Sequence, residues 1–166
     1  MYTQTYKLIT LLCAQQNSSS ITTERKVKDV IGLLLVTHGN FGAELLRSAE
    51  LIVGPFEQAE ALTLQHGDDV QVLRKNVAER ICALDQGEGV LVLIDLFGGS
   101  PSNITAANMR ETDFQCLTGV NMAMLVEALE FREECDLVEL KERCLEAGRA
   151  GIRDLREAFQ ARKMKA

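Results

Sequence analysis

Short apolar runs alternate with helix-like segments along most of the chain, and this alternation constrains the fold more than any other feature. Four runs have strand character: 31–36 (IGLLLV), 59–64 (AEALTL), 89–97 (GVLVLIDLF) and 114–119 (FQCLTG). The segments between them carry apolar residues at spacings of three and four, which is typical of amphipathic helices. Because strands joined by helices form parallel sheets through right-handed crossovers, the sequence predicts an α/β fold with helices on both faces of the sheet.

The predicted helices span 41–53, 70–84, about 101–109, 121–131 and most of 136–160. The first is expected to bury one face, which consists of Phe41, Leu45, Ala49, Ile52 and Val53. The second is the clearest amphipathic helix, with Asp68 or Asp69 as its N-cap and an apolar face made of Val70, Leu73, Val77, Ile81 and Leu84. Gly148 and Gly151 interrupt the last segment, and 151–155 (GIRDL) is therefore a candidate for a last short strand.

The chain of 166 residues is long enough for one domain with a core and too short for two. Residues 1–29 are expected to be a disordered N-terminal extension, because the polar stretch at 15–26 has no periodicity. The domain is predicted to span 30–155, and 156–166 to form a C-terminal tail. No apolar run approaches the roughly 18 residues needed to span a membrane, and we expect a cytoplasmic protein.

The net charge of −6 and the sequence pI near 5.0 argue against nucleic acid as a partner. Phosphate backbones are bound by clustered Lys and Arg side chains, which an acidic protein of this kind does not offer in excess. The five cysteines have no C-x-x-C spacing. We therefore expect reduced thiols and not a metal or disulfide role for them, and we expect the protein to need no organic cofactor.

Three loops follow predicted strands: 37–42 (THGNFG), 95–103 (DLFGGSPSN) and 119–124 (GVNMAM). In a doubly wound sheet of order 2-1-3-4, the first and third strands are neighbours at the point where the strand order reverses. The loops that follow these two strands then face one crevice. This topology predicts that His38 and Asp95 lie side by side, with Ser100 above them.

His38 and Asp95 together suit nucleophilic chemistry. A neutral imidazole is a competent nucleophile near neutral pH, provided that the nitrogen that does not attack carries the proton. A carboxylate that accepts this N–H fixes the tautomer and stabilises the cation that forms on attack. Asp95 is the candidate for this orienting role.

The residues around this pair suit an anion. Gly39, Gly98 and Gly99 allow backbone N–H groups to approach an anion closely. Ser100 stands at the start of a predicted helix with Pro101 in its first turn, and adds a hydroxyl group beside the positive helix end. A nucleophilic histidine beside such a nest is suited to accepting a phosphoryl group.

Other interpretations of these residues stay open. A single histidine near a strand end can be structural, and His38, Asp95 and Ser100 could also form a hydrolase triad. Ser100 lies in G-G-S-P-S and not in G-x-S-x-G, so the sequence signals no nucleophile elbow. His66 is read as a turn residue that could also line the rim of the crevice. Asn121 and Met122 either pack in the domain or shape a wall of the crevice.

Three segments carry a family resemblance: 32–54 (GLLLVTHGNFGAELLRSAELIVG), 89–109 (GVLVLIDLFGGSPSNITAANM) and 117–129 (LTGVNMAMLVEAL). They resemble the IIA component of the mannose/fructose/sorbose family of the bacterial phosphoenolpyruvate-dependent sugar phosphotransferase system. The resemblance covers about residues 31–155, and its motifs occur in the family's order. The dihydroxyacetone kinase phosphoryl-donor subunits share the fold and a similar histidine, but the GGSPSN turn fits the sugar family better.

The resemblance implies a phosphotransferase that works through a phosphohistidine. His38 would accept a phosphoryl group, at Nε2, from the histidine-containing phosphocarrier protein and pass it to a separate IIB component. Asp95 would orient His38, and the residues implied near the phosphoryl group are Ser100, Thr37, Gly39, Gly98 and Gly99. The membrane is reached only indirectly, through transporter components that contact the sugar.

The family fold is a homodimer that exchanges a C-terminal strand, for which 151–155 is the candidate here. Residues 1–29 are not part of the family pattern. An alternative function is a regulatory binding module whose phosphorylation state controls a kinase or a transcription factor. Both functions use His38, and they differ in the protein that follows in the relay.

Overall fold

The computed structural model describes residues 30–163, and the extension expected at 1–29 lies outside the described residues. One four-stranded, all-parallel sheet has the order β2-β1-β3-β4, as the sequence predicts. The strands are β1 (Gly32–His38), β2 (Ala59–Leu64), β3 (Val90–Ile94) and β4 (Gln115–Thr118). The helices are α2 (Phe41–Val53), α3 (Val70–Leu84), α4 (Ser100–Asn108), α5 (Met122–Phe131), α6 (Leu137–Ala150) and α7 (Leu155–Lys163).

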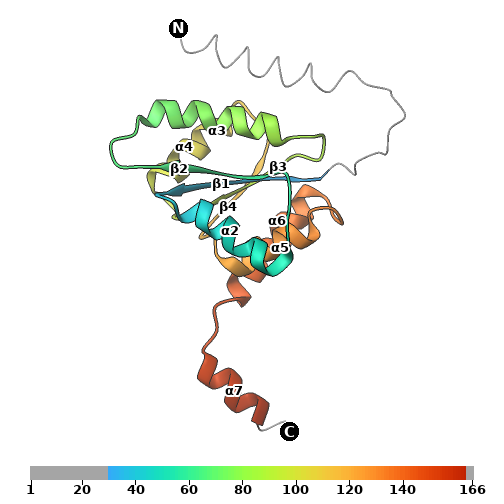
Figure 1. Cartoon of the computed structure of the whole chain (residues 1–166). Helices are drawn as coiled ribbons and strands as arrows, with labels where there is room; N and C mark the ends of the chain where they lie inside the picture. Colours follow the sequence, from blue (N-terminus) through green and yellow to red (C-terminus); the bar gives the residue numbers. More distant parts are fainter. Residues whose placement is uncertain (1–29, 164–166) are drawn as a thin grey trace, which may run out of the picture.

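The sheet lies between two helical layers, with α3 and α4 on one face and α2, α5 and α6 on the other (Figure 1). The central strand β1 packs against both layers, because its alternating residues point to opposite faces of the sheet. Leu34 and Val36 pack in the cluster with α3 and α4, and Leu33 and Leu35 in the cluster with α5 and α6. Strands that are buried on both faces need such continuous apolar runs.

The register of the two central strands brings the ends of β1 and β3 together. Val36 pairs with Ile94, so Thr37 and Asp95 are the next residues on each side. His38 is the last residue of β1, and the loop after β3 starts at Asp95. The two predicted site residues therefore leave the sheet at the same edge, which is its carboxyl edge.

The third strand is shorter than predicted. It ends at Ile94, whereas the apolar pattern suggested a strand to residue 97. Leu96 and Phe97 lie in the turn that leads to α4 and are 60% and 83% exposed. A positive φ of 77° at Gly98 reverses the chain here, and this turn takes the two apolar side chains out of the core.

The exposed faces of α2 and α3 also depart from prediction. Ala49 is buried, but Phe41 and Ile52 of α2 are largely exposed, and so is Val70 at the start of α3. A 3.6-residue period identifies which face of a helix is apolar. It does not show how far along that face a neighbouring element extends.

The predicted strand at 151–155 is not formed in the single chain. Gly151 ends α6 in a turn, residues 152–154 have no regular structure, and α7 begins at Leu155. Helix α7 projects away from the body of the domain (Figure 1). Its apolar side chains Leu155 and Phe159 are exposed, as is Ile152 before it. An exchanged strand would need a second chain, and stays a prediction.

Between residues 30 and 163, no helix combines the length and the apolar character that a bilayer crossing requires.

Candidate active site

His38 and Asp95 make direct contact at the carboxyl edge of the sheet. His38 Nδ1 lies 2.8 Å from Asp95 Oδ2, and the backbone N–H of His38 donates to the same oxygen, also at 2.8 Å. The side chain of His38 is 44% exposed and that of Asp95 16% exposed. The pair that the sequence predicts from topology is therefore present, with the imidazole open to solvent.

The charge of Asp95 decides the tautomer of His38. Burial raises the pKa of Asp95, but hydrogen bonds from the backbone and ring of His38 and from the N–H of Leu96 outweigh it and lower the pKa below 3.8. An ionised carboxylate can only accept hydrogen bonds. Nδ1 of a neutral His38 therefore carries the proton, and Nε2 carries the free lone pair.

Thr37 does not line the site in the way that the resemblance implies. Its side chain is fully buried, and its hydroxyl accepts a hydrogen bond from the backbone N–H of Gly42 at 2.9 Å. The hydroxyl thus satisfies a free N–H in the first turn of α2. Its contribution is to hold the loop that follows β1, because strand alternation turns its side chain into the domain while the His38 imidazole stays exposed.

Gly39 also has a structural partner. Its φ of 53° lies in the left-handed region, and the chain turns there from β1 into α2. Its N–H donates to the carbonyl of Leu64 at the end of β2, at 2.9 Å. This N–H is therefore already engaged by the domain itself, and a role of Gly39 in binding a phosphoryl group stays a prediction.

The turn after Asp95 packs against the imidazole. The N–H of Gly99 donates to the Leu96 carbonyl at 3.3 Å and closes a four-residue turn with Gly98 as its third residue. A Cβ atom added at Gly99 would lie 2.9 Å from Cε1 of His38. Gly99 is thus next to His38, whereas a Cβ atom added at Gly98 would have no atom within 4 Å, and the N–H of Gly99 is engaged within the turn.

Ser100 opens helix α4 and is exposed, with Pro101 after it in the first turn. The first N–H groups of a helix have no partner within the helix, and they attract anions together with the helix dipole. That the hydroxyl of Ser100 and the first-turn N–H groups of α4 bind an anion beside His38 stays a prediction. Asn103 of the same helix donates its side-chain N–H to the Gly98 carbonyl at 3.2 Å.

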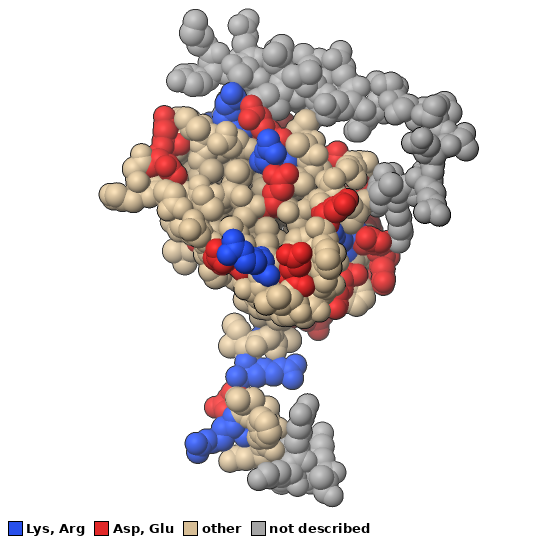
Figure 2. All heavy atoms as spheres, in the orientation of Figure 1, with Lys and Arg blue, Asp and Glu red and all other residues tan. Residues whose placement is uncertain are grey.

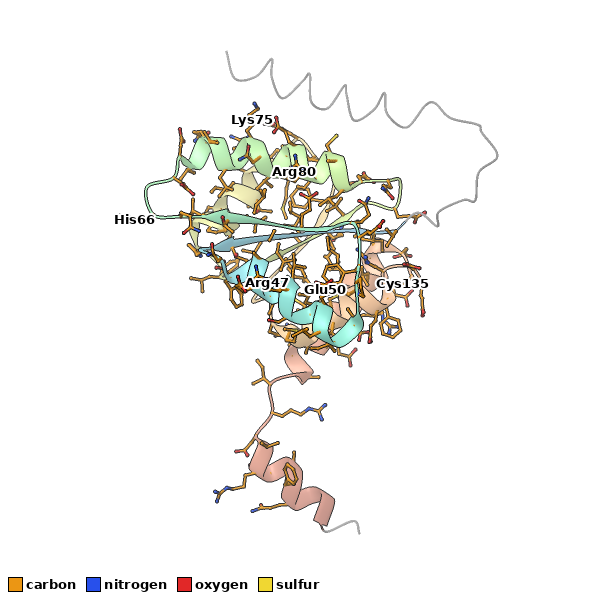
Figure 3. The ribbon with its side chains drawn as sticks, in the orientation of Figure 1. Arg47, Glu50, His66, Lys75, Arg80 and Cys135 are labelled. Atoms are coloured by element: carbon orange, nitrogen blue, oxygen red, sulfur yellow. The ribbon has the colours of Figure 1, made fainter. Side chains whose placement is uncertain are left out.

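A hollow of about 490 Å³ lies beside His38, on the side of β2. Its lining includes Gln65, His66 and Asp68 from the loop that follows β2. Figure 3 shows His66 at the carboxyl end of that strand. The side chain of Gln65 donates to Asn40 Oδ1 at 2.9 Å and ties this loop to the loop after β1. His66 is thus both a turn residue and part of the rim.

The loop after β4 serves packing. Asn121 caps α5 by accepting a hydrogen bond from the N–H of Met124 at 3.0 Å, and it donates to the carbonyl of Gly148 in α6 at 3.1 Å. Both groups of the amide are therefore used to join the two helices. This observation favours packing, one of the two interpretations that the sequence left open for Asn121.

Several residues near His38 were missed by the sequence reasoning. The apolar pattern predicts Leu96 and Phe97 as the end of a buried strand, but both side chains are exposed, as is Phe41 at the start of α2. Gln65 and Asn103 carried no signal beyond their place in a loop or a turn. Their roles appear only in the structure, where Gln65 donates to the side chain of Asn40 and Asn103 to the carbonyl of Gly98.

Several charged side chains on the helices around the sheet form ion pairs. On the face shown in Figure 2, basic side chains of α2 and α3 stand beside acidic ones. The pairs are Arg47 with Glu44 at 3.0 Å, Lys75 with Glu79 at 3.5 Å, and Arg80 with Glu60 at 3.3 Å. Among residues 30–163, no group of three or more His, Cys, Asp or Glu side chains could hold a metal ion.

Comparison with known proteins identifies the family to which the domain is similar. The sequence model of the family described as "PTS system fructose IIA component" matches residues 32–145. The chain is 31% identical over 128 residues to the mannose-specific EIIAB component of Escherichia coli (strain K12), which covers 76% of this chain and 40% of that protein. It is 30% identical over 112 residues to the fructose-specific EIIA component of Bacillus subtilis (strain 168), which covers 67% of this chain and 77% of that protein.

Solved structures agree with this assignment. An EIIA component of the phosphotransferase system from Streptococcus agalactiae has a TM-score of 0.70 at 28% identity, over 76% of this chain and 98% of that one. The mannose/sorbose-specific IIA subunit from Enterococcus faecalis has a TM-score of 0.66 at 26% identity, over 76% and 95%. The chain belongs to the mannose/fructose IIA family of the phosphotransferase system. It spans about 40% of the length of the E. coli relative that it matches.

Proposed function

We propose that this protein is a phosphohistidine carrier. It accepts a phosphoryl group on Nε2 of His38 from the histidine-containing phosphocarrier protein and passes it to a separate IIB component for sugar uptake. The observation that carries the proposal is the 2.8 Å contact between His38 Nδ1 and an ionised Asp95, which leaves the lone pair of Nε2 in solvent.

The transfer step follows from this geometry. The lone pair of Nε2 attacks phosphorus, the P–N bond of the donor histidine breaks, and its electron pair returns to the donor ring. The proton on Nδ1 of His38 stays in place, and the ring becomes cationic as the P–Nε2 bond forms. The carboxylate of Asp95 stabilises this cation. The Ser100 hydroxyl and the first N–H groups of α4 bind the phosphoryl oxygens. The transfer to the acceptor is the same step in reverse.

The surroundings of His38 favour a protein as donor and acceptor. Leu96 and Phe97 follow Asp95 directly in the chain, Phe41 stands three residues after His38, and all three side chains are exposed. Large exposed apolar side chains are typical of protein contacts. A cytoplasmic homodimer fits the family. In this proposal the membrane is reached only through the transporter components that receive the phosphoryl group.

The proposal is tested by the mass of the intact protein after incubation with phosphoenolpyruvate, the general phosphotransferase enzyme and the phosphocarrier protein. We expect an acid-labile gain of one phosphoryl group, absent in His38→Ala. The chain has two histidines, so His66→Ala is the matched control and is expected to keep the label. A His38→Ala protein that is labelled like the wild type would contradict the assignment of His38.

The acceptor is identified in a second step, in which purified phosphorylated protein is mixed with an IIB protein. Loss of the phosphoryl group from His38 and its gain by the IIB protein are expected. If labelling succeeds but no IIB protein takes the group, the regulatory function becomes the better assignment. If the wild type takes no label while a known IIA protein is labelled in the same tube, the carrier function is wrong.

A further inference from the structure

Gly99 occupies a position that needs no glycine for its backbone. It is the N-cap of α4 with φ −72° and ψ 172°, a conformation that any residue adopts. N-cap positions favour Ser, Thr, Asp and Asn, whose side chains accept a hydrogen bond from the first turn. What excludes a side chain is His38, because an added Cβ would lie 2.9 Å from Cε1 and 3.5 Å from Nε2 of its ring. The edge of the imidazole that carries Cε1 and Nε2 therefore occupies the space that a side chain at Gly99 would take.

This contact depends on the turn from Leu96 to Gly99. Gly98 adopts a φ of 77°, which the third residue of a type II turn requires. The hydrogen bond that closes the turn, from the Gly99 N–H to the Leu96 carbonyl, is long at 3.3 Å. A second tie comes from Asn103, whose side-chain N–H donates to the Gly98 carbonyl at 3.2 Å while its backbone N–H donates to the Gly99 carbonyl at 3.0 Å.

Nothing in the helix itself calls for asparagine at 103. The residue is exposed in the first half of α4, where asparagine is a weaker helix former than alanine. Its amide is used for the carbonyl of Gly98, five residues earlier in the sequence. The side chain thus joins the helix to the turn that touches His38.

We propose that Asn103 is a positioning residue for His38. Its amide fixes the Gly98 carbonyl, the fixed turn keeps Gly99 against the ring, and the ring is held between this turn and Asp95. Asp95 sets which nitrogen attacks, and Asn103 sets where that nitrogen points. The effect on phosphoryl transfer rests on the proposed function above, whereas the contact between Gly99 and His38 can be measured without it.

The first test is Asn103→Ala, followed by three measurements. The nuclear Overhauser effect between Gly99 Hα and His38 Hε1 is expected to weaken, since the turn loses one of its ties. The single-turnover rate of phosphoryl acceptance is expected to fall about five- to tenfold, because small misplacements of a reacting group are costly. The midpoint of thermal unfolding is expected to stay level or rise, because alanine is the better helix former at an exposed position.

Three further variants separate positioning from a general structural effect. Asn103→Gln keeps a donor amide and is expected to recover part of the rate. Gly99→Ala is expected to move the ring directly and to slow transfer more than Asn103→Ala does. Asn76→Ala makes the same chemical change in α3 and is expected to leave the rate and the Overhauser effect unchanged.

The outcomes are distinguishable from those of the carrier proposal. If Asn103→Ala keeps the wild-type Overhauser effect, or if its rate falls only in step with a lower unfolding midpoint, the positioning role is overturned. It is also overturned if the wild type is labelled and Asn103→Ala is labelled at the same rate. If the wild type takes no phosphoryl group, the carrier function fails, and the Overhauser effect alone decides whether Asn103 positions His38.

Discussion

The two edges of the sheet each carry a charged side chain that ties down a loop, but they use it differently. At the carboxyl edge, Asp95 accepts from the backbone and ring of His38. At the amino edge, Arg132 donates to the carbonyls of Glu57 and Gln58 in the loop before β2, at 2.6 and 3.1 Å. Arg132 is 6% exposed, whereas the ring that Asp95 holds is open to solvent.

The difference lies in what each contact leaves free. The guanidinium of Arg132 is aimed at backbone carbonyls of its own chain, and its pKa is lowered by burial, an effect that Glu133 partly opposes. At the other edge, Asp95 holds one nitrogen of His38 and leaves the second available. The hollow at the amino edge, lined by Arg132, is about 650 Å³, larger than the one of about 490 Å³ beside His38. Size alone therefore does not mark the functional edge; the free reactive atom does.

The largest effect on stability is expected from Arg132→Met. The carbonyls of Glu57 and Gln58 lose the charged donors of the buried Arg132, and we expect the free energy of unfolding to fall by about 2–3 kcal/mol. Urea denaturation measures this, while the rate of phosphoryl acceptance of the folded protein should stay at the wild-type level. A variant that loses the rate but not the stability would make the amino edge part of the functional site.

Asp95→Asn is the counterpart at the carboxyl edge. An amide weakens the tautomer preference of His38 and removes the charge that stabilises its cation, so acceptance of the phosphoryl group should slow by about an order of magnitude or more. This corresponds to about 1.4 kcal/mol in the barrier. Single-turnover labelling measures the rate. An unchanged rate would remove Asp95 from the mechanism and leave it with the same structural role as Arg132.

Thr37→Val separates a structural role at the carboxyl edge from a role in phosphoryl transfer. The substitution leaves the N–H of Gly42 without its buried acceptor, and the free energy of unfolding should fall by about 1–2 kcal/mol. Because the hydroxyl is buried, the rate of transfer should change little. Thr37→Ser keeps the hydroxyl and is the control. A large loss of rate with intact stability would restore the implied role of Thr37 at the phosphoryl group.

The smallest effect concerns pH. The pKa of Asp95 is lower in the folded protein than its ordinary value of 3.8, so its contribution to stability is complete above that pH and is lost as the pH falls through the lower folded value. The difference in free energy of unfolding between the wild type and Asp95→Asn should therefore shrink below about pH 4. A difference that stays constant down to about pH 2.5 would mean that the charge of Asp95 contributes nothing to stability.

Much of the fold could be predicted because its signals are local. The apolar run of β1 and the three-and-four spacing of α3 each lie within one segment, and the positions of both elements are confirmed. The alternation of strands and helices indicated a doubly wound sheet, and its expected strand order 2-1-3-4 is confirmed. The prediction was wrong at Phe97, because a local apolar pattern does not show where a turn takes side chains out of the core. The exchanged strand at 151–155 stays a prediction.

The residues of the site also fall into those that the sequence predicts and those that only the structure shows. His38 and Asp95 were predictable because topology alone brings the ends of β1 and β3 together. The engagement of the Gly39 N–H was not predicted because its acceptor, the Leu64 carbonyl, lies 25 residues further along the chain. Asn103 was overlooked because its partner is a backbone carbonyl, which no sequence pattern distinguishes from any other.

The sequence by itself determined the α/β class, the edge at which His38 and Asp95 meet and the family to which the chain belongs. These depend on periodicity and on residue type, which the chain carries locally. Only the tertiary structure decided which hydrogen-bonding groups are already satisfied and which remain free. Whether Thr37 is buried, whether a glycine N–H is engaged and which nitrogen of His38 faces solvent depend on partners supplied by other segments. A hydrogen bond is settled by distance and direction in space, and the chain acquires both only when it folds.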